Sequence, residues 1–138
     1  MGQVFVSFAI RNAFDLGLVQ QGRESPGHVR SVELTDVLMD TGATLLCLPA
    51  RIVAALGLNF DREVAVATPT GAATLRIFRD ARVEYEDRAT AASVIELPDD
   101  AQPLLGAIPM EELGIEPDLQ NRRVRKFPMD LRSSFMRV

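Results

Sequence analysis

A chain of 138 residues is long enough to build one domain with a substantial core and too short for two. Apolar residues make up 47% of the chain and its formal net charge is −4, so composition favours a globular protein and gives no electrostatic reason to expect nucleic acid as a partner. One cysteine, Cys47, excludes an intrachain disulfide and a Cys/His zinc cluster. No apolar run is long enough to span a membrane, and no basic segment precedes an apolar one, so we expect a cytoplasmic location and no membrane partner.

The first half of the chain predicts two strands and one helix. Residues 4–10 alternate in polarity and residues 29–39 do so in part, which is typical of strands. Between them, residues 11–28 contain three glycines and a proline and are predicted to form a long surface loop. Residues 49–58 carry apolar side chains at helical spacing, with Gly57 as the C-terminal stop.

The second half predicts hairpins. The expected segments are strands 63–67 and 74–78 around the turn TPTG at 68–71, strands 81–85 and 90–97 around a turn at 86–87, one helical turn at 109–113 ended by Gly114, and strands 115–119 and 123–127. These elements predict an all-β fold with one or two short helices and a closed, barrel-like sheet. We expect a single domain over residues 1–138, with its core at about 3–127 and a tail at 128–138.

The segment VLMDTGATLLCLP, residues 37–49, places one carboxylate, that of Asp40, inside an apolar run. A buried charge without a partner is costly, so such a residue usually has a partner or a function. Thr41 offers a hydroxyl to fix the turn, and Gly42 allows the backbone to approach closely. A lone carboxylate can act as a general base on water, but peptide hydrolysis also needs an acid to protonate the departing nitrogen.

Two carboxyl groups in contact provide both, because like charges held together share one proton. The carboxyl pair of aspartic proteases is an example, and its two pKa values belong to the pair and not to either residue alone. Asp-Thr-Gly or Asp-Ser-Gly occurs once in this chain, at 40–42, so a pair requires a second copy of the molecule. We therefore expect an obligate homodimer with one active site on its two-fold axis.

These motifs resemble those of the retropepsin-like aspartic proteases, most closely the small cellular and bacterial members. The matching motifs are the apolar-Asp-Thr-Gly-Ala run Leu38–Ala43, the apolar-apolar-Gly run Leu104, Leu105 and Gly106, and a hairpin where the family has its flap. The resemblance covers about residues 3–127 and implies the acid protease fold. The acid and the basic residue that pair in retroviral members are replaced by Thr44 and Ala107.

The resemblance also implies roles for the motif residues. Asp40 from each subunit would activate the water, Thr41 would brace the pair across the axis, and Gly42 would present its carbonyl to the substrate. The implied substrate-binding residues are Ala43 in the cleft and Thr68, Pro69, Thr70 and Gly71 in the flap. Leu104, Leu105 and Gly106 would support the catalytic loop from behind. The substrate would be an extended peptide bound by strand addition, with no metal or organic cofactor.

Other interpretations stay open at this point. Asp40 could cap neighbouring amides at a simple strand-to-turn junction, and Cys47 reads as a small core residue. His28 reads as an exposed loop residue, and the basic run at 122–126 as a solvated terminal strand. A catalytically silent peptide-binding or dimerisation module with the same fold is the alternative to a protease, and a self-processing domain is a third possibility.

Overall fold

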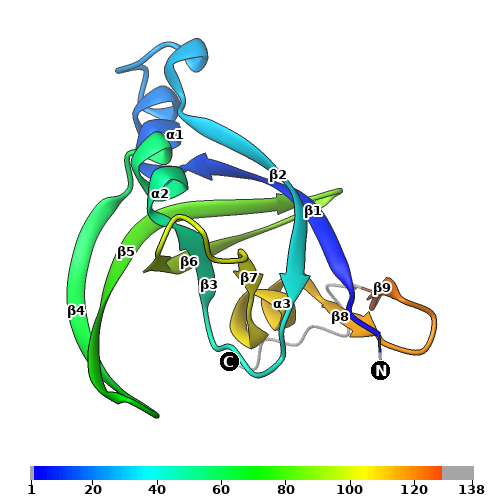
Figure 1. The fold of residues 1–138 in the computed structure, drawn as a ribbon. Coiled ribbons are helices and arrows are strands. Elements are labelled where there is room, and N and C mark those ends of the chain that lie inside the picture. Colours follow the sequence, from blue (N-terminus) through cyan, green and yellow to red (C-terminus); the bar gives the residue numbers. More distant parts are fainter. Residues whose placement is uncertain (1, 129–138) are drawn as a thin grey trace, which may run out of the picture.

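Strands dominate the structure, a computed structural model that describes residues 2–128 (Figure 1). The strands are β1 (Phe5–Asn12), β2 (Ser31–Met39), β3 (Leu46–Pro49), β4 (Asn59–Thr68), β5 (Gly71–Tyr85), β6 (Arg88–Leu97), β7 (Leu104–Leu105), β8 (Ile115–Asp118) and β9 (Arg123–Lys126). The helices are α1 (Ala13–Gln20), the 3₁₀ turn η1 (Pro26–His28), α2 (Ala50–Leu56) and α3 (Ala107–Leu113). The expectation of a mostly β fold is confirmed.

The large sheet closes into a ring of strands. Its order is β1-β2-β7-β3-β6-β5-β4, and β1 also pairs with β5, which joins the two sides of the sheet. β4 stays outside this ring and pairs with β5 alone, so the β4–β5 hairpin forms an arm. β8 and β9 form a separate antiparallel pair. In Figure 1 the arm curves away on one side and the β8–β9 pair lies on the other.

The core lies inside the ring and follows the two-residue period of the strands. In β1 and just before it, Val4, Val6, Phe8 and Ile10 are buried, whereas Phe5 is 43% exposed. Helices α2 and α3 each bury a terminal leucine, Leu56 and Leu113, in the same core cluster. Both helices end at a glycine in the left-handed conformation, Gly57 and Gly114, as the sequence predicts.

The prediction of a long loop at 11–28 is wrong. The segment holds the end of β1, helix α1 and the turn η1, so residues 2–128 contain three α-helices and not one or two. The three glycines favour a loop, but Gly17 lies inside α1, and no neighbouring atom lies within 4 Å of the place where its Cβ would stand. The helix begins because the side chain of Asn12, its N-cap, accepts a hydrogen bond from the Asp15 amide at 2.9 Å.

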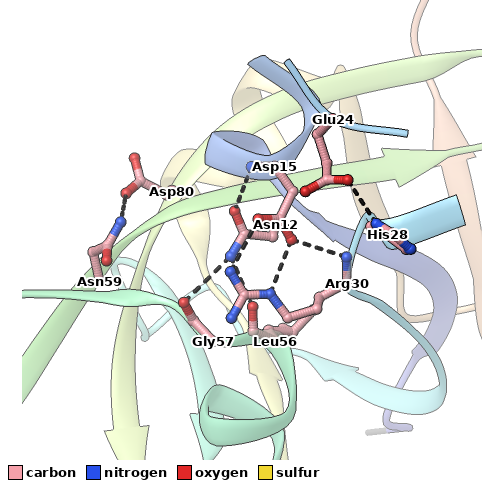
Figure 2. Close-up of polar contacts among 9 residues, drawn as sticks. All are labelled: Asn12, Asp15, Glu24, His28, Arg30, Leu56, Gly57, Asn59 and Asp80. Carbon is pink, nitrogen blue, oxygen red and sulfur yellow. Dashed lines mark hydrogen bonds and ion pairs between the residues drawn. The ribbon is translucent and has the colours of Figure 1, made fainter. Parts of the chain in front are cut away.

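Buried polar side chains hold α1 against the rest of the molecule (Figure 2). Asn12 is fully buried, and its Nδ2 donates to the carbonyl oxygens of Leu56 at 2.8 Å and Gly57 at 3.3 Å. The Asp15 carboxylate accepts hydrogen bonds from the backbone amide, Nε and Nη2 of Arg30 at 2.9–3.0 Å. The start of α1, the end of α2 and the approach to β2 are thus joined at one point.

The second half of the chain is built mainly of antiparallel strands. The two predicted strands 74–78 and 81–85 are one long strand, β5, with an irregular register at Phe78/Ala81, where Asp80 has a φ of 76°. The hairpin turns at 69–70 and 86–87 and the last strand pair are confirmed. His28 is exposed, and its Nδ1 lies 2.6 Å from Glu24 Oε1. Of the predicted tail at 128–138, residues 129–138 lie outside the described part of the chain.

Three of the four basic side chains in the run at 122–126 have acidic partners. Arg123 and Arg125 contact Asp118, and Lys126 contacts Glu86 and Asp87. This arrangement agrees with a solvated terminal strand. Among residues 2–128, no helix has the length and apolar character needed to cross a membrane.

Candidate active site

Asp40 is the first residue after β2, at the start of the connection to β3. The loop turns at once: the Ala43 amide donates to the Asp40 carbonyl oxygen at 3.1 Å. The Asp40 amide donates to the carbonyl oxygen of Leu105 at 3.0 Å. The carboxylate therefore projects from the end of a strand whose backbone is fixed on both sides of the turn.

The short strand β7 braces this loop from behind. It lies between β2 and β3, parallel to β2 and antiparallel to β3, so Leu38 and Cys47 both pair with Leu104. Gly106 then passes so close to the loop that an added Cβ would lie 2.4 Å from the Leu45 carbonyl oxygen. The amides of Ala107 and Ile108, at the start of α3, donate to the carbonyl oxygens of Ala43 at 2.8 Å and Thr44 at 3.0 Å.

The Asp40 carboxylate is half-buried and has one oxygen available. Its Oδ1 accepts a hydrogen bond from the Gly42 amide at 2.9 Å, which is the one hydrogen bond that residues 2–128 give it. Thr41 and Gly42 are exposed, and Ala43 is half-buried. The motif therefore presents a carboxylate, a hydroxyl and a free backbone surface to whatever lies beyond the loop.

An apolar row runs across the sheet on the same side as Asp40. The strand registers align Phe5, Leu38, Leu104, Cys47, Ile95 and Ile77, from β1 through β2, β7, β3 and β6 to β5. Aligned residues of paired strands point to one face, opposite the core residues Met39, Leu105 and Leu46. Asp40 lies two residues after Leu38, so its side chain points to the same face of the sheet as that of Leu38. We call these six residues the apolar row.

Cys47 belongs to the apolar row, and both burial and the negative charge of Asp40 affect the pKa of its thiol. Burial, reinforced by the neighbouring negative charge of Asp40, raises the pKa of the Cys47 thiol to about 11. Cys47 is only 6% exposed, which agrees with its expected role as a small buried residue. A thiol with such a pKa is almost wholly protonated at neutral pH and is not a nucleophile.

The predicted flap residues lie at the tip of the β4–β5 arm, where Thr68 pairs with Gly71 and the Thr68 hydroxyl donates to the Gly71 carbonyl oxygen at 2.6 Å. One face of the arm carries Val64, Val66 and Leu75, each half-buried, and continues the face of Ile77. The arm is held at its base, where Arg76 lies over the rings of Phe60 and Phe78 at 5.4 and 5.0 Å. Figure 1 shows the tip and the β2–β3 connection at the same end of the molecule.

The structure thus brings Asp40, Thr41, Gly42 and Ala43 together with Leu104, Leu105 and Gly106, whereas Thr68, Pro69, Thr70 and Gly71 lie on the separate arm. Leu105 is a core residue, but Leu104 belongs to the apolar row beside Asp40. The sequence interpretation missed Cys47, Ile77 and Ile95, because their position depends on strand register. The period of two in β2 could have identified Leu38.

Within residues 2–128, no three or more His, Cys, Asp or Glu side chains are grouped in a way that could hold a metal ion. In comparisons with models of known protein families and with curated proteins, no match to this chain is found.

Proposed function

We propose that the protein is an aspartic endopeptidase of the retropepsin-like type, in which two copies of the chain form one active site. The observation that carries the proposal is the Asp40 loop, braced from behind by β7 and α3 while its carboxylate and Thr41 face outward. Such bracing fixes a catalytic carboxylate before substrate arrives, which is what general acid–base catalysis requires. The two-fold axis passes between the two Asp40 side chains.

In the proposed reaction the two Asp40 carboxyl groups share one proton. The ionised group takes a proton from water as the water oxygen attacks the peptide carbonyl carbon, and the protonated group gives its proton to the carbonyl oxygen. As the tetrahedral intermediate collapses and its C–N bond breaks, the first group gives the proton that it took from water to the departing nitrogen, and the second takes a proton from a hydroxyl group of the intermediate. The products are a carboxylic acid and an amine, and the pair again holds one proton. Thr41 from each chain holds the loops together across the axis.

The proposed substrate is an extended peptide with apolar side chains next to the cleaved bond. Leu38 and Leu104 are half-buried members of the apolar row beside Asp40 and supply an apolar wall. The β4–β5 arm supplies a free strand edge that can bind a peptide backbone by strand addition. Val64, Val66 and Leu75 on the arm then face the bound side chains.

A matched pair of variants tests the proposal. Asp40→Asn keeps the size of the side chain but removes the proton-accepting group, so cleavage of an apolar peptide library falls by about 10²–10⁴-fold. Asp36→Asn is the control, because Asp36 is an exposed residue of the same strand with a φ of 57°, a conformation that asparagine also adopts. Cleavage by Asp36→Asn at the wild-type rate is expected. Equal cleavage by wild type and Asp40→Asn would exclude the proposed mechanism.

The peptide-binding module remains the second candidate, and the separation of the β4–β5 arm from the Asp40 loop within one chain favours it. An arm that binds a peptide without closing on the carboxylates gives binding without cleavage. Peptide binding measured by fluorescence anisotropy with wild-type protein, together with no cleavage from pH 3 to 8, is the result that distinguishes this function from a protease.

A further inference from the structure

One arginine, Arg88, holds the end of helix α3 and the end of strand β9 together. Its Nη1 donates to the carbonyl oxygens of Leu113 at 3.0 Å and Gly114 at 2.8 Å, and its Nη2 donates to that of Phe127. Arg88 is the first residue of β6 and lies 25–39 residues away from these partners in the sequence. A guanidinium beside the last carbonyl groups of a helix is stabilising, because these groups have no partners within the helix.

The opposite end of α3 binds the Asp40 loop. No side chain caps the helix at Gly106; instead, the Ala107 and Ile108 amides donate to the carbonyl oxygens of Ala43 and Thr44. Ala43 is itself hydrogen-bonded to the Asp40 carbonyl oxygen. The helix has seven residues, so Arg88 and the loop are separated by a rigid element about 10 Å long.

We propose that Arg88 is a positioning residue for the Asp40 loop. By fixing the C-terminal end of α3, it fixes the direction in which the two N-terminal amides point and hence the backbone of residues 43–44. Its effect on catalysis rests on the proposed function, whereas its effect on the loop does not.

Loss of Arg88 is expected to act locally, because other contacts keep α3 in place. Met110 and Leu113 are buried in the core, and the Thr90 hydroxyl donates to Glu112 Oε1 at 3.0 Å. Lys126 offers a matched control, because its Nζ binds Glu86 and Asp87 in the turn next to Arg88, and neither of these residues belongs to α3. The Lys126 contacts join the same turn to β9 only.

The test compares amide hydrogen exchange, followed by NMR, in wild type, Arg88→Met and Lys126→Met. Methionine keeps an unbranched apolar side chain and removes every donor. In Arg88→Met the Ala107 and Ile108 amides are expected to exchange about tenfold faster, the effect of about 1.4 kcal/mol on a local opening equilibrium. The amides of Leu46 and Val94, in the core strands, keep their wild-type rates, and Lys126→Met leaves all four unchanged.

Equal acceleration of all four amides in Arg88→Met, or of none, overturns the proposal. If Arg88→Met does not fold, Arg88→Lys takes its place, since lysine keeps the charge but cannot reach the acceptors as a planar fork. It is expected to accelerate the Ala107 and Ile108 amides by a smaller factor, and wild-type rates at both would overturn the proposal.

A kinetic measurement separates this proposal from the proposed function. If wild type cleaves peptides, Arg88→Met is expected to lower kcat about tenfold, again the effect of about 1.4 kcal/mol, with KM within about twofold of wild type. A wild-type enzyme that cleaves, combined with unchanged exchange in Arg88→Met, overturns the role of Arg88 and leaves the protease intact. Accelerated exchange in a protein that cleaves nothing supports Arg88 and counts against the protease.

Discussion

Gly106 determines, at the scale of single residues, how closely α3 and β7 can approach the Asp40 loop. Three backbone atoms, the Leu45 carbonyl oxygen, the Thr44 carbonyl carbon and the Ala43 carbonyl oxygen, lie within 2.8 Å of the place where a Cβ would stand. Backbone atoms cannot rotate away as a side chain does. The position therefore requires glycine for space, since its φ of −89° is open to any residue.

Gly106→Ala is predicted to destabilise the fold by about 1–3 kcal/mol or more, because the loop must move to accommodate the methyl group. Chemical denaturation measures the free energy of unfolding. Gly17→Ala is the control: Gly17 lies inside α1, nothing lies within 4 Å of its added Cβ, and alanine stabilises a helix interior by about 0.5–1 kcal/mol. Stability changes of the same sign and size in both variants would contradict this account.

Local motifs were sufficient to predict part of the site from the sequence. Asp-Thr-Gly marks the end of a strand and a tight turn, and Leu104 to Gly106 mark the segment that packs behind this turn. Both motifs can be recognised in the sequence because each consists of consecutive residues. The apolar row could not be predicted, since Cys47, Ile95 and Ile77 become neighbours only through pairing of strands distant in sequence. The closed character of the sheet likewise depends on the β1–β5 pairing.

At the scale of elements, helix α1 is attached to the molecule by buried polar groups and not by an apolar face. Its one buried residue is Asp15, whereas Phe14 is 54% exposed, so the helix lacks the apolar periodicity by which helices are recognised in sequences. Its attachment depends on hydrogen bonds to Asn12 and Arg30. This is the physical reason why residues 11–28 were predicted to be a loop.

Asp15→Asn is predicted to change how stability depends on pH. Hydrogen bonds from Arg30 hold the pKa of Asp15 below its ordinary value of 3.8. The ionised pair therefore stabilises the fold fully above about pH 4, and this contribution is lost as pH falls through the depressed pKa. The free energy of unfolding of wild type is expected to exceed that of Asp15→Asn by about 1–2 kcal/mol at pH 7. This value is kept small because Arg30 is half exposed. At pH 3 the difference between the two proteins is expected to be smaller.

Urea denaturation at several pH values measures this difference. Asp61→Asn is the control, because Asp61 contacts Arg62 at the exposed end of β4 and such surface pairs contribute little. Its stability is expected to stay within about 0.5 kcal/mol of wild type throughout. A wild-type advantage over Asp15→Asn that grows as pH falls would contradict the proposed role of the ion pair.

At the scale of the whole molecule, each chain supplies half of the proposed catalytic centre. Mixing wild-type and variant subunits tests this proposal. If each active site needs two ionisable Asp40 residues, a dimer of one wild-type and one Asp40→Asn chain is inactive. Equal amounts of the two chains, mixed until the subunits exchange, then give one quarter wild-type dimers by random pairing. Cleavage is expected to fall to about half of that given by the wild-type chains alone at the same concentration. Unchanged cleavage after complete exchange would contradict a shared site.

The two-residue strand β7 has a consequence for how the chain reaches its folded state. During synthesis β2 and β3 emerge well before it. β2 can pair with β1 and β3 with β6, but the facing edges of β2 and β3 have no partner until residues 104–105 insert between them. Until then two apolar strand edges remain open to pairing with other chains. Closure therefore waits for one of the last elements, as expected for proteins that fold slowly through distant contacts. The segment that supports Asp40 thus also covers two strand edges at which another chain could pair.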